Sequence, residues 1–290
     1  MHKSVLLKES LDILDLQQGD IYFDATLGEG GHSLEVYKRM GGKVAIAGID
    51  ADPKAVEVAK DRLEKEGFKP KLANLNFREI VKAPELLGIG KPTKILFDLG
   101  WNKGQFEEGG RGFSFQKDEP LLMTFGDSTS SEFTAYDIVN TWDAENIETI
   151  ISAYGEDKFA WKIARRIVES RDRNPIKTSF QLADIVKFAV PVYARFGRTH
   201  PATKTFQALR IAVNDELRAL EEGLKGAIEI LSSGGRLAVI TFHSLEDRIV
   251  KRYFKNLVDS EQVELLNKKP IVPTEEEVKN NPRSRSAKLR

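Results

Sequence analysis

The chain has 290 residues, of which 41% are hydrophobic, and its 44 lysines and arginines balance its 44 aspartates and glutamates. This length allows one large domain or two, and the zero net charge means that any nucleic-acid contact must come from a local patch. Without cysteine the chain forms no disulfide and no thiolate metal site, and the longest apolar run, residues 44–49, is too short to cross a membrane. We therefore expect a cytoplasmic protein that has no metal site and no membrane partner.

The first 100 residues alternate between strand and helix patterns. Short apolar runs predict strands at 21–23, 44–49, 72–76 and 95–97. Helical spacing and helix stop signals predict helices at 6–14, 33–40, 53–66 and 78–87. This alternation is typical of an α/β protein with a doubly wound parallel sheet.

The character of the chain changes after residue 100. Residues 101–126 read as a long loop, and helical patterns then dominate residues 131–193, which predicts an inserted helical domain. Residues 203–231 carry an apolar residue every three or four positions, which predicts one long amphipathic helix. A strand at 237–242 resumes the sheet, and a basic tail closes the chain. We place the domains at 1–115, 116–202 and 203–290, where the first and third form one sheet domain.

In the sheet domain, three predicted strands end in an acid, namely Asp24, Asp50 and Asp98. The carboxyl ends of neighbouring parallel strands form a crevice, so these acids indicate a site for a nucleotide-like cofactor. Asp50 lies 20 residues beyond Gly30 and is placed to hydrogen-bond the ribose of an adenosine. NAD and S-adenosylmethionine both suit this geometry. Ser33 stands where the NAD fingerprint requires glycine or alanine, and Asp24 is placed for the amino group of methionine, which favours S-adenosylmethionine.

Histidines and a basic stretch are further candidates. His32 lies at a helix start beside the crevice, and His243 lies at the end of the last predicted strand. Ser244 and Asp247 are placed as a pair that caps the following helix. No acid occurs between Lys187 and Arg210, and such a basic stretch suits phosphate contacts as well as an ordinary solvated surface.

Several motifs then lead to a known family. They are His2-x-x-Val5-Leu6-Leu7, Asp24-Ala25-Thr26-Leu27-Gly28-Glu29-Gly30-Gly31-His32-Ser33, Asp50-x-Asp52-Pro53, Asp98-Leu99-Gly100, Arg111-Gly112-Phe113-Ser114-Phe115, Tyr154-Gly155-Glu156, His200-Pro201-Ala202-Thr203, Asn214-x-Glu216-Leu217, Phe242-His243-Ser244-Leu245-Glu246-Asp247-Arg248 and Asn281-Pro282-Arg283-x-Arg285-Ser286. With these motifs the chain resembles the bacterial 16S rRNA (cytosine-N4)-methyltransferases of the RsmH/MraW type over nearly its whole length.

The resemblance implies a class I S-adenosylmethionine-dependent methyltransferase with a Rossmann-like, doubly wound sheet and an inserted α-helical domain for substrate recognition. It implies methyl transfer to N4 of a cytidine in the decoding region of 16S rRNA, with the small ribosomal subunit as partner. The implied cofactor-binding residues are Gly30, Gly31, His32, Asp50, Phe77, Asp98 and Gln105, beside Asp24, which the spacing already suggests.

Two stretches depart from the family pattern. After Asp98-Leu99-Gly100 the family usually has a small residue, two serines and a proline, where this chain has residues 101–104, Trp-Asn-Lys-Gly. The family's Leu-Asp-Met-Arg-Met corresponds to residues 121–125, Leu-Leu-Met-Thr-Phe. Both stretches are expected on the acceptor side of the site. The departures therefore keep two alternatives open, an altered acceptor and a non-catalytic ribosome-assembly homologue; a nicotinamide-dependent oxidoreductase is a more distant alternative.

For the chemistry, a group must accept a hydrogen bond from the cytosine amine and take its proton. The candidates are Asp98, His243 and Asn102, and Trp101 is a candidate to stack on the base. Residues that we expect to contact RNA are Trp101, Arg198, His200, Lys204, Arg210, Arg283 and Arg285. The pattern leaves the oligomeric state, monomer or homodimer, open.

Overall fold

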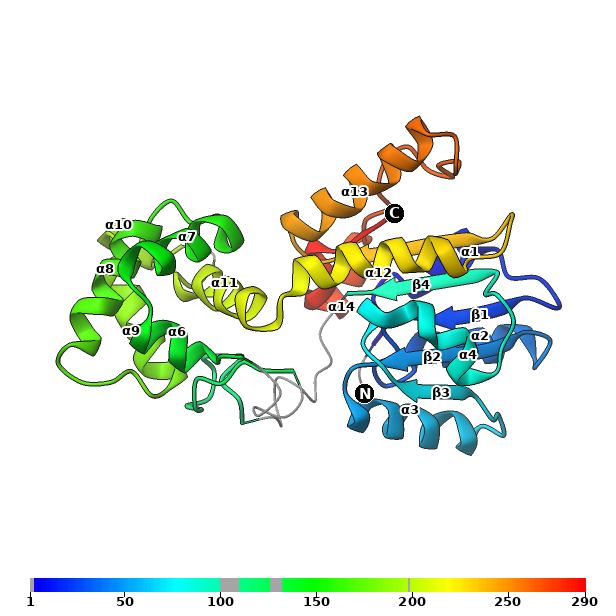
Figure 1. Cartoon of the computed structure of the whole chain (residues 1–290), viewed down its shortest axis with the longest axis horizontal. Coiled ribbons are helices and arrows are strands. Elements are labelled where there is room, and N and C mark those ends of the chain that lie inside the picture. The colour runs from blue at the N-terminus through cyan, green and yellow to red at the C-terminus, as the bar shows by residue number, and fades with distance from the viewer. Residues whose placement is uncertain (1–2, 100–109, 126–131, 198) are drawn as a thin grey trace. The chain divides into compact units, whose positions relative to one another are not determined.

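The structure is a computed structural model that describes residues 3–99, 110–125, 132–197 and 199–290. The chain divides into two compact units (Figure 1). Unit 1 comprises Met1–Asn102 and Leu217–Arg290, and unit 2 comprises Lys103–Glu216. These edges differ from the predicted domain boundaries at 115/116 and 202/203, and the helix α11, described below, accounts for the second difference.

Unit 1 is built on a six-stranded sheet with the order β3-β2-β1-β4-β5-β6. Its strands are β1 (Ile21–Asp24), β2 (Ala45–Asp50), β3 (Lys71–Asn74), β4 (Lys94–Asp98), β5 (Arg236–Thr241) and β6 (Lys288–Leu289). The first five run parallel, and β6 pairs antiparallel with β5. The predicted α/β class and doubly wound parallel sheet are confirmed.

Helices cover both faces of this sheet. The helices of unit 1 are α1 (Leu7–Leu14), α2 (Gly31–Met40), α3 (Pro53–Lys65), η1 (Phe77–Lys82), α4 (Ala83–Leu87), α12 (Glu216–Ile230), α13 (Ser244–Asp259), α14 (Glu275–Asn280) and η3 (Pro282–Ser286). Successive strand residues point to opposite faces, so Phe23 packs in the core that contains α12, while Tyr22 packs in the core that contains α1. Because both faces are buried, the strands read as continuous apolar runs.

Unit 2 is helical among its described residues. It contains α6 (Ala135–Thr141), α7 (Ala144–Gly155), α8 (Ala160–Arg171), α9 (Ser179–Ala189), α10 (Val192–Arg195) and α11 (Ala202–Asn214). Gly155 allows α7 to approach α11 closely, because a Cβ at this position would lie 2.8 Å from the carbonyl oxygen of Lys204. None of the helices described in either unit has the length and apolar composition of a membrane span.

The prediction of one long helix over residues 203–231 was wrong. The chain forms α11 and α12 instead, and Asp215 between them has left-handed backbone angles, φ 48° and ψ 41°. The Asn214 side chain holds the break, since its amide donates to the carbonyl of Met123 and accepts from the N–H of Phe125. An apolar period continues across a single left-handed residue, so the spacing alone did not reveal the break.

The C-terminal tail is also more structured than predicted. The last residues form β6, and Arg290 exchanges backbone hydrogen bonds with Val239. Asp247 accepts from Lys288 Nζ at 2.8 Å and from Arg290 Nε at 2.6 Å, and these cations lower the pKa of its carboxyl group against the effect of its burial. Residues 279–290 contain five basic residues, and two of them, Lys288 and Arg290, therefore bind the sheet domain itself.

Candidate cofactor site and nucleic-acid surfaces

The ends of β1, β2 and β4 meet at one edge of the sheet, because these three strands are neighbours. Each ends in an acid, as predicted: Asp24, Asp50 and Asp98. Between β1 and α2, Gly28 and Gly30 have φ values of 51° and 72°, which side chains with a Cβ rarely adopt. The glycine turn therefore brings bare backbone to the edge where the three acids lie.

Asp50 is bound to this turn. One of its carboxylate oxygens accepts from the N–H of Gly28 at 2.8 Å, and the other accepts from the N–H of Asp52 at 2.9 Å. Desolvation raises the pKa of the Asp50 carboxyl to about 6, although these two hydrogen bonds oppose the rise. Each oxygen has a second lone pair, so the group that fixes the turn can also accept from a diol.

Asp24 is the most buried of the three acids, with 1% of its surface exposed. Its carboxylate accepts from the hydroxyl of Ser33 at 2.9 Å and from that of Tyr22 at 3.3 Å. Burial raises its pKa to about 6, and the same burial, together with the charge of Asp24, raises the pKa of Tyr22 well above its ordinary value. A positively charged ligand beside Asp24 would offset this desolvation.

His32 adds a neutral acceptor. Its Nε2 lies 3.2 Å from the carbonyl oxygen of Val5, a pairing that places the ring proton on Nε2 and leaves the lone pair on Nδ1. Nδ1 lies 3.7 Å from a carboxylate oxygen of Asp98. Burial lowers the pKa of the ring, which favours its neutral form. Asp24, Asp98 and Nδ1 of His32 are thus hydrogen-bond acceptors in one region, which suits an ammonium group that has three N–H donors.

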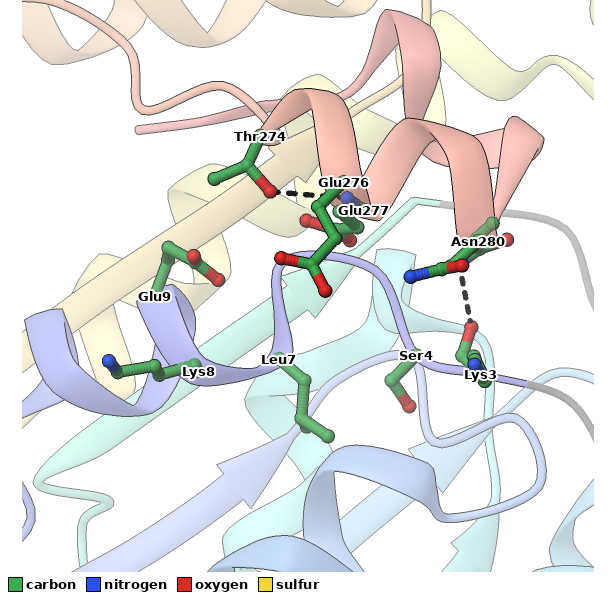
Figure 2. A pocket seen from close by; sticks show the side chains of 10 residues that line it. Lys3, Ser4, Leu7, Lys8, Glu9, Thr274, Glu276, Glu277 and Asn280 are labelled. Atoms are coloured by element: carbon green, nitrogen blue, oxygen red, sulfur yellow. Dashed lines mark hydrogen bonds between the residues drawn. The ribbon is translucent and has the colours of Figure 1, made fainter.

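The segment that carries Val5 is held by the C-terminal part of unit 1. The N–H of Leu6 donates to Glu277 Oε1 at 2.8 Å, and Asn281 Nδ2 donates to the carbonyl of Lys3 at 3.2 Å. Leu6 has a left-handed φ of 49°, which the hydrogen bond to Glu277 helps to maintain. We call residues 3–6 the N-terminal strap. Figure 2 shows the strap residues Lys3 and Ser4 facing α14. Both segments line an open pocket of about 310 Å³.

Phe77 lies near the end of β3, at the start of η1. Its ring packs edge-on against Phe97, with centroids 5.7 Å apart, and it lies so close to α12 that a Cβ on Gly223 would approach the ring to 2.7 Å. The side chain is half-buried. The Phe77 side chain therefore packs against Phe97 and α12 and leaves part of its surface exposed.

His243 takes the capping position that was predicted for Ser244. Its Nδ1 accepts from the N–H of Glu246 at 3.3 Å, and Glu246 in return accepts from the N–H of His243 at 3.2 Å. Asp247, the predicted partner in the cap, binds Lys288 and Arg290 instead. The capping prediction was wrong by one residue, because a histidine ring takes the place of the usual hydroxyl as acceptor.

Three of the residues that were expected to contact RNA lie in the described part of unit 2. His200 lies against Phe115, with ring centroids 4.7 Å apart, and its Nδ1 accepts from the N–H of Ala202. Lys204 is exposed, and its Nζ donates to the carbonyl of Glu156 at the end of α7. Arg210 is 8% exposed and makes two hydrogen bonds of 2.8 Å to Glu216. That buried pair gives Arg210 a structural role in the unit.

Arg283 and Arg285 are exposed on η3 of unit 1. Trp101, Asn102, Gln105 and Arg198 lie outside the described residues, so their predicted roles rest on the sequence. No group of histidines and acids suited to a metal ion occurs in the part of the chain that the structure describes.

Sequence reasoning missed the supporting residues Tyr22, Val5 and Glu277. Tyr22 read only as part of a buried strand, although its hydroxyl reaches Asp24. Val5 belongs to the motif His2-x-x-Val5-Leu6-Leu7, which supported the family resemblance but did not reveal that the carbonyl of Val5 binds His32. Glu277 gave no signal, because its partner Leu6 is 271 residues away in the chain.

A doubly wound sheet with a glycine turn, strand-end acids and a helical unit inserted after β4 defines a class I S-adenosylmethionine-dependent methyltransferase. The residues present fit this cofactor: the acceptors around Asp24 suit its ammonium group, and Asp50 suits its ribose.

Comparison with known proteins gives the family. The model of the MraW methylase family matches residues 1–290, and the chain belongs to this family. The ribosomal RNA small subunit methyltransferase H of Sulfurihydrogenibium azorense is 47% identical over 290 residues, which cover 100% of this chain and 97% of that protein. The protein of the same name from Ruminiclostridium cellulolyticum is 44% identical over 306 residues, with the same coverage.

Among solved structures, a putative rRNA-methylase from Clostridium thermocellum is 14% identical with a TM-score of 0.42, and the match covers 100% of this chain and 97% of that chain. The family resemblance that the sequence motifs indicated is confirmed by the family match.

Proposed function

We propose that this protein transfers a methyl group from S-adenosylmethionine to N4 of a cytidine in the decoding region of 16S rRNA, in the cytoplasm. The observation that carries the proposal is the identity of 43–47% to relatives named ribosomal RNA small subunit methyltransferase H, over the whole chain. The sheet-edge site supplies the physical basis, since its acceptors match the donor groups of the cofactor.

In this proposal, Asp24, Asp98 and Nδ1 of His32 hold the ammonium group of the methionine moiety, and Asp50 accepts from the ribose. Gly30 and Gly31 provide bare backbone at the start of α2, and Phe77 borders the adenine. Gln105 completes the set by its position in the family pattern. Bound S-adenosylmethionine supplies an electrophilic sulfonium methyl group.

The acceptor half must align the exocyclic amine of cytosine and withdraw one of its protons. The lone pair of this amine is spread into the ring, so a hydrogen-bond acceptor at N–H returns electron density to nitrogen. We assign this role to Asn102 and the backbone carbonyls that follow Asp98, because Asp98 itself is occupied by the ammonium group in this proposal; Asp98 is the alternative acceptor if the cofactor leaves it free. His243 is a weaker candidate, because its Nδ1 already accepts from the helix that it caps. The cytidine must leave its stack to reach this edge, and Trp101 is assigned to stack on it.

Phosphates of the RNA are assigned to the exposed cations Lys204, Arg283 and Arg285, with Arg198 and His200 from the same basic stretch. Arg210 was expected in this group, but its buried pair with Glu216 leaves it a supporting role. In this proposal the helical insertion recognises the substrate, which is 16S rRNA within or released from the small subunit.

One experiment tests the proposed reaction directly. Undermodified small subunits are incubated with the protein and S-adenosylmethionine that carries a labelled methyl group, and the methylated nucleotide is mapped by mass spectrometry. Label on N4 of one decoding-region cytidine is the expected result. Absence of label, together with measurable binding of the subunit, contradicts the enzyme and supports the assembly-homologue alternative.

An altered acceptor is the second candidate, because residues 101–104 and 122–125 depart from the family pattern. In the structure Thr124 is fully buried and its Oγ1 has no hydrogen-bond partner among the described residues. Phe125 stacks on Phe113 with centroids 5.5 Å apart. Thr124 thus belongs to the interior of unit 2, and Phe125 is half-buried. Label on a different base in the same experiment would establish this alternative.

A further inference from the structure

Unit 2 displays large apolar side chains on the segment from the end of α9 through α10. Phe188, Val192, Tyr193 and Phe196 have 56%, 63%, 73% and 80% of their surface exposed. Three of the four are aromatic, and they fall within nine consecutive positions of the chain. We call the three aromatic residues of this segment, Phe188, Tyr193 and Phe196, with Lys158 and Arg195, the aromatic–cation surface.

Cations lie directly on the rings of this surface. Lys158 Nζ lies 5.0 Å from the ring centre of Phe159 and 6.0 Å from that of Tyr193. The guanidinium of Arg195 lies 5.2 Å from the ring centre of Phe188, and it is held there because Arg195 donates to the carbonyls of Phe188 and Val190. The ring faces and the positive charges are therefore presented together, and Arg195 is fixed in place by the backbone.

The lack of acidic residues around α10 indicates which kind of partner can bind this surface. No aspartate or glutamate occurs from residue 185 to residue 214, which includes α10 and α11. A surface that interleaves cations with exposed aromatic rings complements a single-stranded nucleic acid, whose phosphates need cations and whose bases need flat apolar partners. A second copy of this chain would bring the same cations to the interface and repel itself.

We propose that the aromatic–cation surface binds a single-stranded segment of RNA by stacking bases on Tyr193 and Phe196, with Lys158 and Arg195 facing the phosphates. This inference rests on the proposed function and extends it, since it assigns a holding surface separate from the residues that receive the cofactor. It selects unpaired RNA over duplex RNA, because only unstacked bases offer their faces to a ring.

The test measures fluorescence anisotropy of the full-length protein with a labelled single-stranded RNA of about 12 nucleotides and with the matching duplex. Removing each ring, Tyr193→Ala and Phe196→Ala, is expected to weaken single-strand binding about tenfold. Val192→Ala is the matched control, because this apolar neighbour is also largely exposed, at 63%, but has no ring. Tyr193→Phe keeps the ring and is expected to retain the affinity.

The outcomes separate this inference from the proposed function. Calorimetric affinity for S-adenosylmethionine is expected to be unchanged in all four variants. If the wild-type protein methylates subunits and Tyr193→Ala and Phe196→Ala bind RNA as the wild type does, the stacking surface is refuted while the reaction stands. If wild-type protein gives no methylation but the ring variants lose RNA affinity, the surface stands and the reaction fails. Light scattering is the last check: a dimer that these variants dissociate, with RNA affinity unchanged, assigns the surface to self-association.

Discussion

The sheet edge of unit 1 buries a charged group, whereas the aromatic–cation surface of unit 2 exposes apolar rings. At the sheet edge, the Asp24 carboxylate is buried and accepts hydrogen bonds from Ser33 and Tyr22. On unit 2, aromatic rings are exposed, and Phe196 has 80% of its surface free. Buried charge stores unfavourable desolvation that a cationic ligand relieves, whereas exposed rings lose water when a base covers them. The two regions therefore suit a small charged cofactor and a large flexible polymer.

The largest effect is expected from the loss of Arg210, which tests whether the stability of unit 2 depends on its ion pair with Glu216. Arg210→Ala leaves the partly buried Glu216 without its bidentate partner, and removal of one member of a buried pair costs up to about 3–5 kcal/mol. Urea unfolding should show this loss. The exposed Lys204→Ala is the control and should change stability by about 1 kcal/mol or less. A stable Arg210→Ala protein that had lost only its RNA affinity would return Arg210 to the RNA-contact group.

The next effect concerns cofactor affinity at the sheet edge. Asp50→Ala removes a charge-assisted hydrogen bond to the ribose and the partner of the Gly28 N–H. We expect the loss of about 1.5–3 kcal/mol of binding free energy, measured by titration calorimetry with S-adenosylmethionine. Asp52→Ala is the control: it removes the cap of α3, which lowers stability by about 1 kcal/mol but leaves cofactor affinity unchanged. Equal affinity in Asp50→Ala would contradict the ribose assignment.

A third prediction follows from the pKa of Asp24, which burial raises to about 6. An ammonium group binds the carboxylate form, so affinity for S-adenosylmethionine should rise about tenfold from about pH 5 to about pH 7 and then level off. Asp24→Asn should bind more weakly and with a smaller change over this range. A wild-type profile that is flat below pH 6 would remove Asp24 from the ammonium site.

Without cofactor, the raised pKa of Asp24 lowers the stability of the protein as the pH rises. The folded state binds the proton of Asp24 more tightly than the unfolded state, whose pKa is near 3.8. Its contribution to the free energy of unfolding therefore falls as the pH rises from about 4 to about 6. Asp24→Asn should remove this part of the pH dependence in thermal unfolding.

The smallest expected effect concerns the N-terminal strap. Glu277→Ala removes the acceptor of the Leu6 N–H, which should cost about 1 kcal/mol of stability and weaken cofactor binding a few-fold through Val5 and His32. Glu277→Gln keeps an acceptor oxygen and should behave as the wild type. Glu276→Ala changes the exposed neighbour on α14 and is the matched control. If Glu277→Ala alters stability alone, the strap does not influence the cofactor site.

Much of the sheet domain could be predicted from the sequence, because strands that are buried on both faces read as apolar runs. Asp24, Asp50 and Asp98 were found by the same logic, since a strand end fixes where its last side chain lies. Unit 2 was predicted as helical, but its exposed rings were not, because helical spacing does not distinguish an aromatic residue in a core from one on a surface.

The remaining features depend on contacts that no local pattern records. The strand β6 has two residues, too few for a periodic signal, and it exists because β5 offers a free edge. The break at Asp215 depends on the Asn214 side chain meeting residues 89 and 91 positions away. The strap depends on Glu277 in the same way. Each of these features depends on long-range hydrogen bonds that set the local backbone.

The strap has a consequence for biosynthesis. The strands β1 and β2, the glycine turn and α2 are translated early, yet the strap residues beside them are fastened by Glu277 and Asn281, which are made after the whole of unit 2. Strand β6 is later still. A nascent chain thus carries Asp24, His32 and Asp50 long before Leu6 can be locked. The strap is therefore fastened only after residues 277–281 have been synthesised, so a chain that ends before them should bind the cofactor more weakly than the full-length chain.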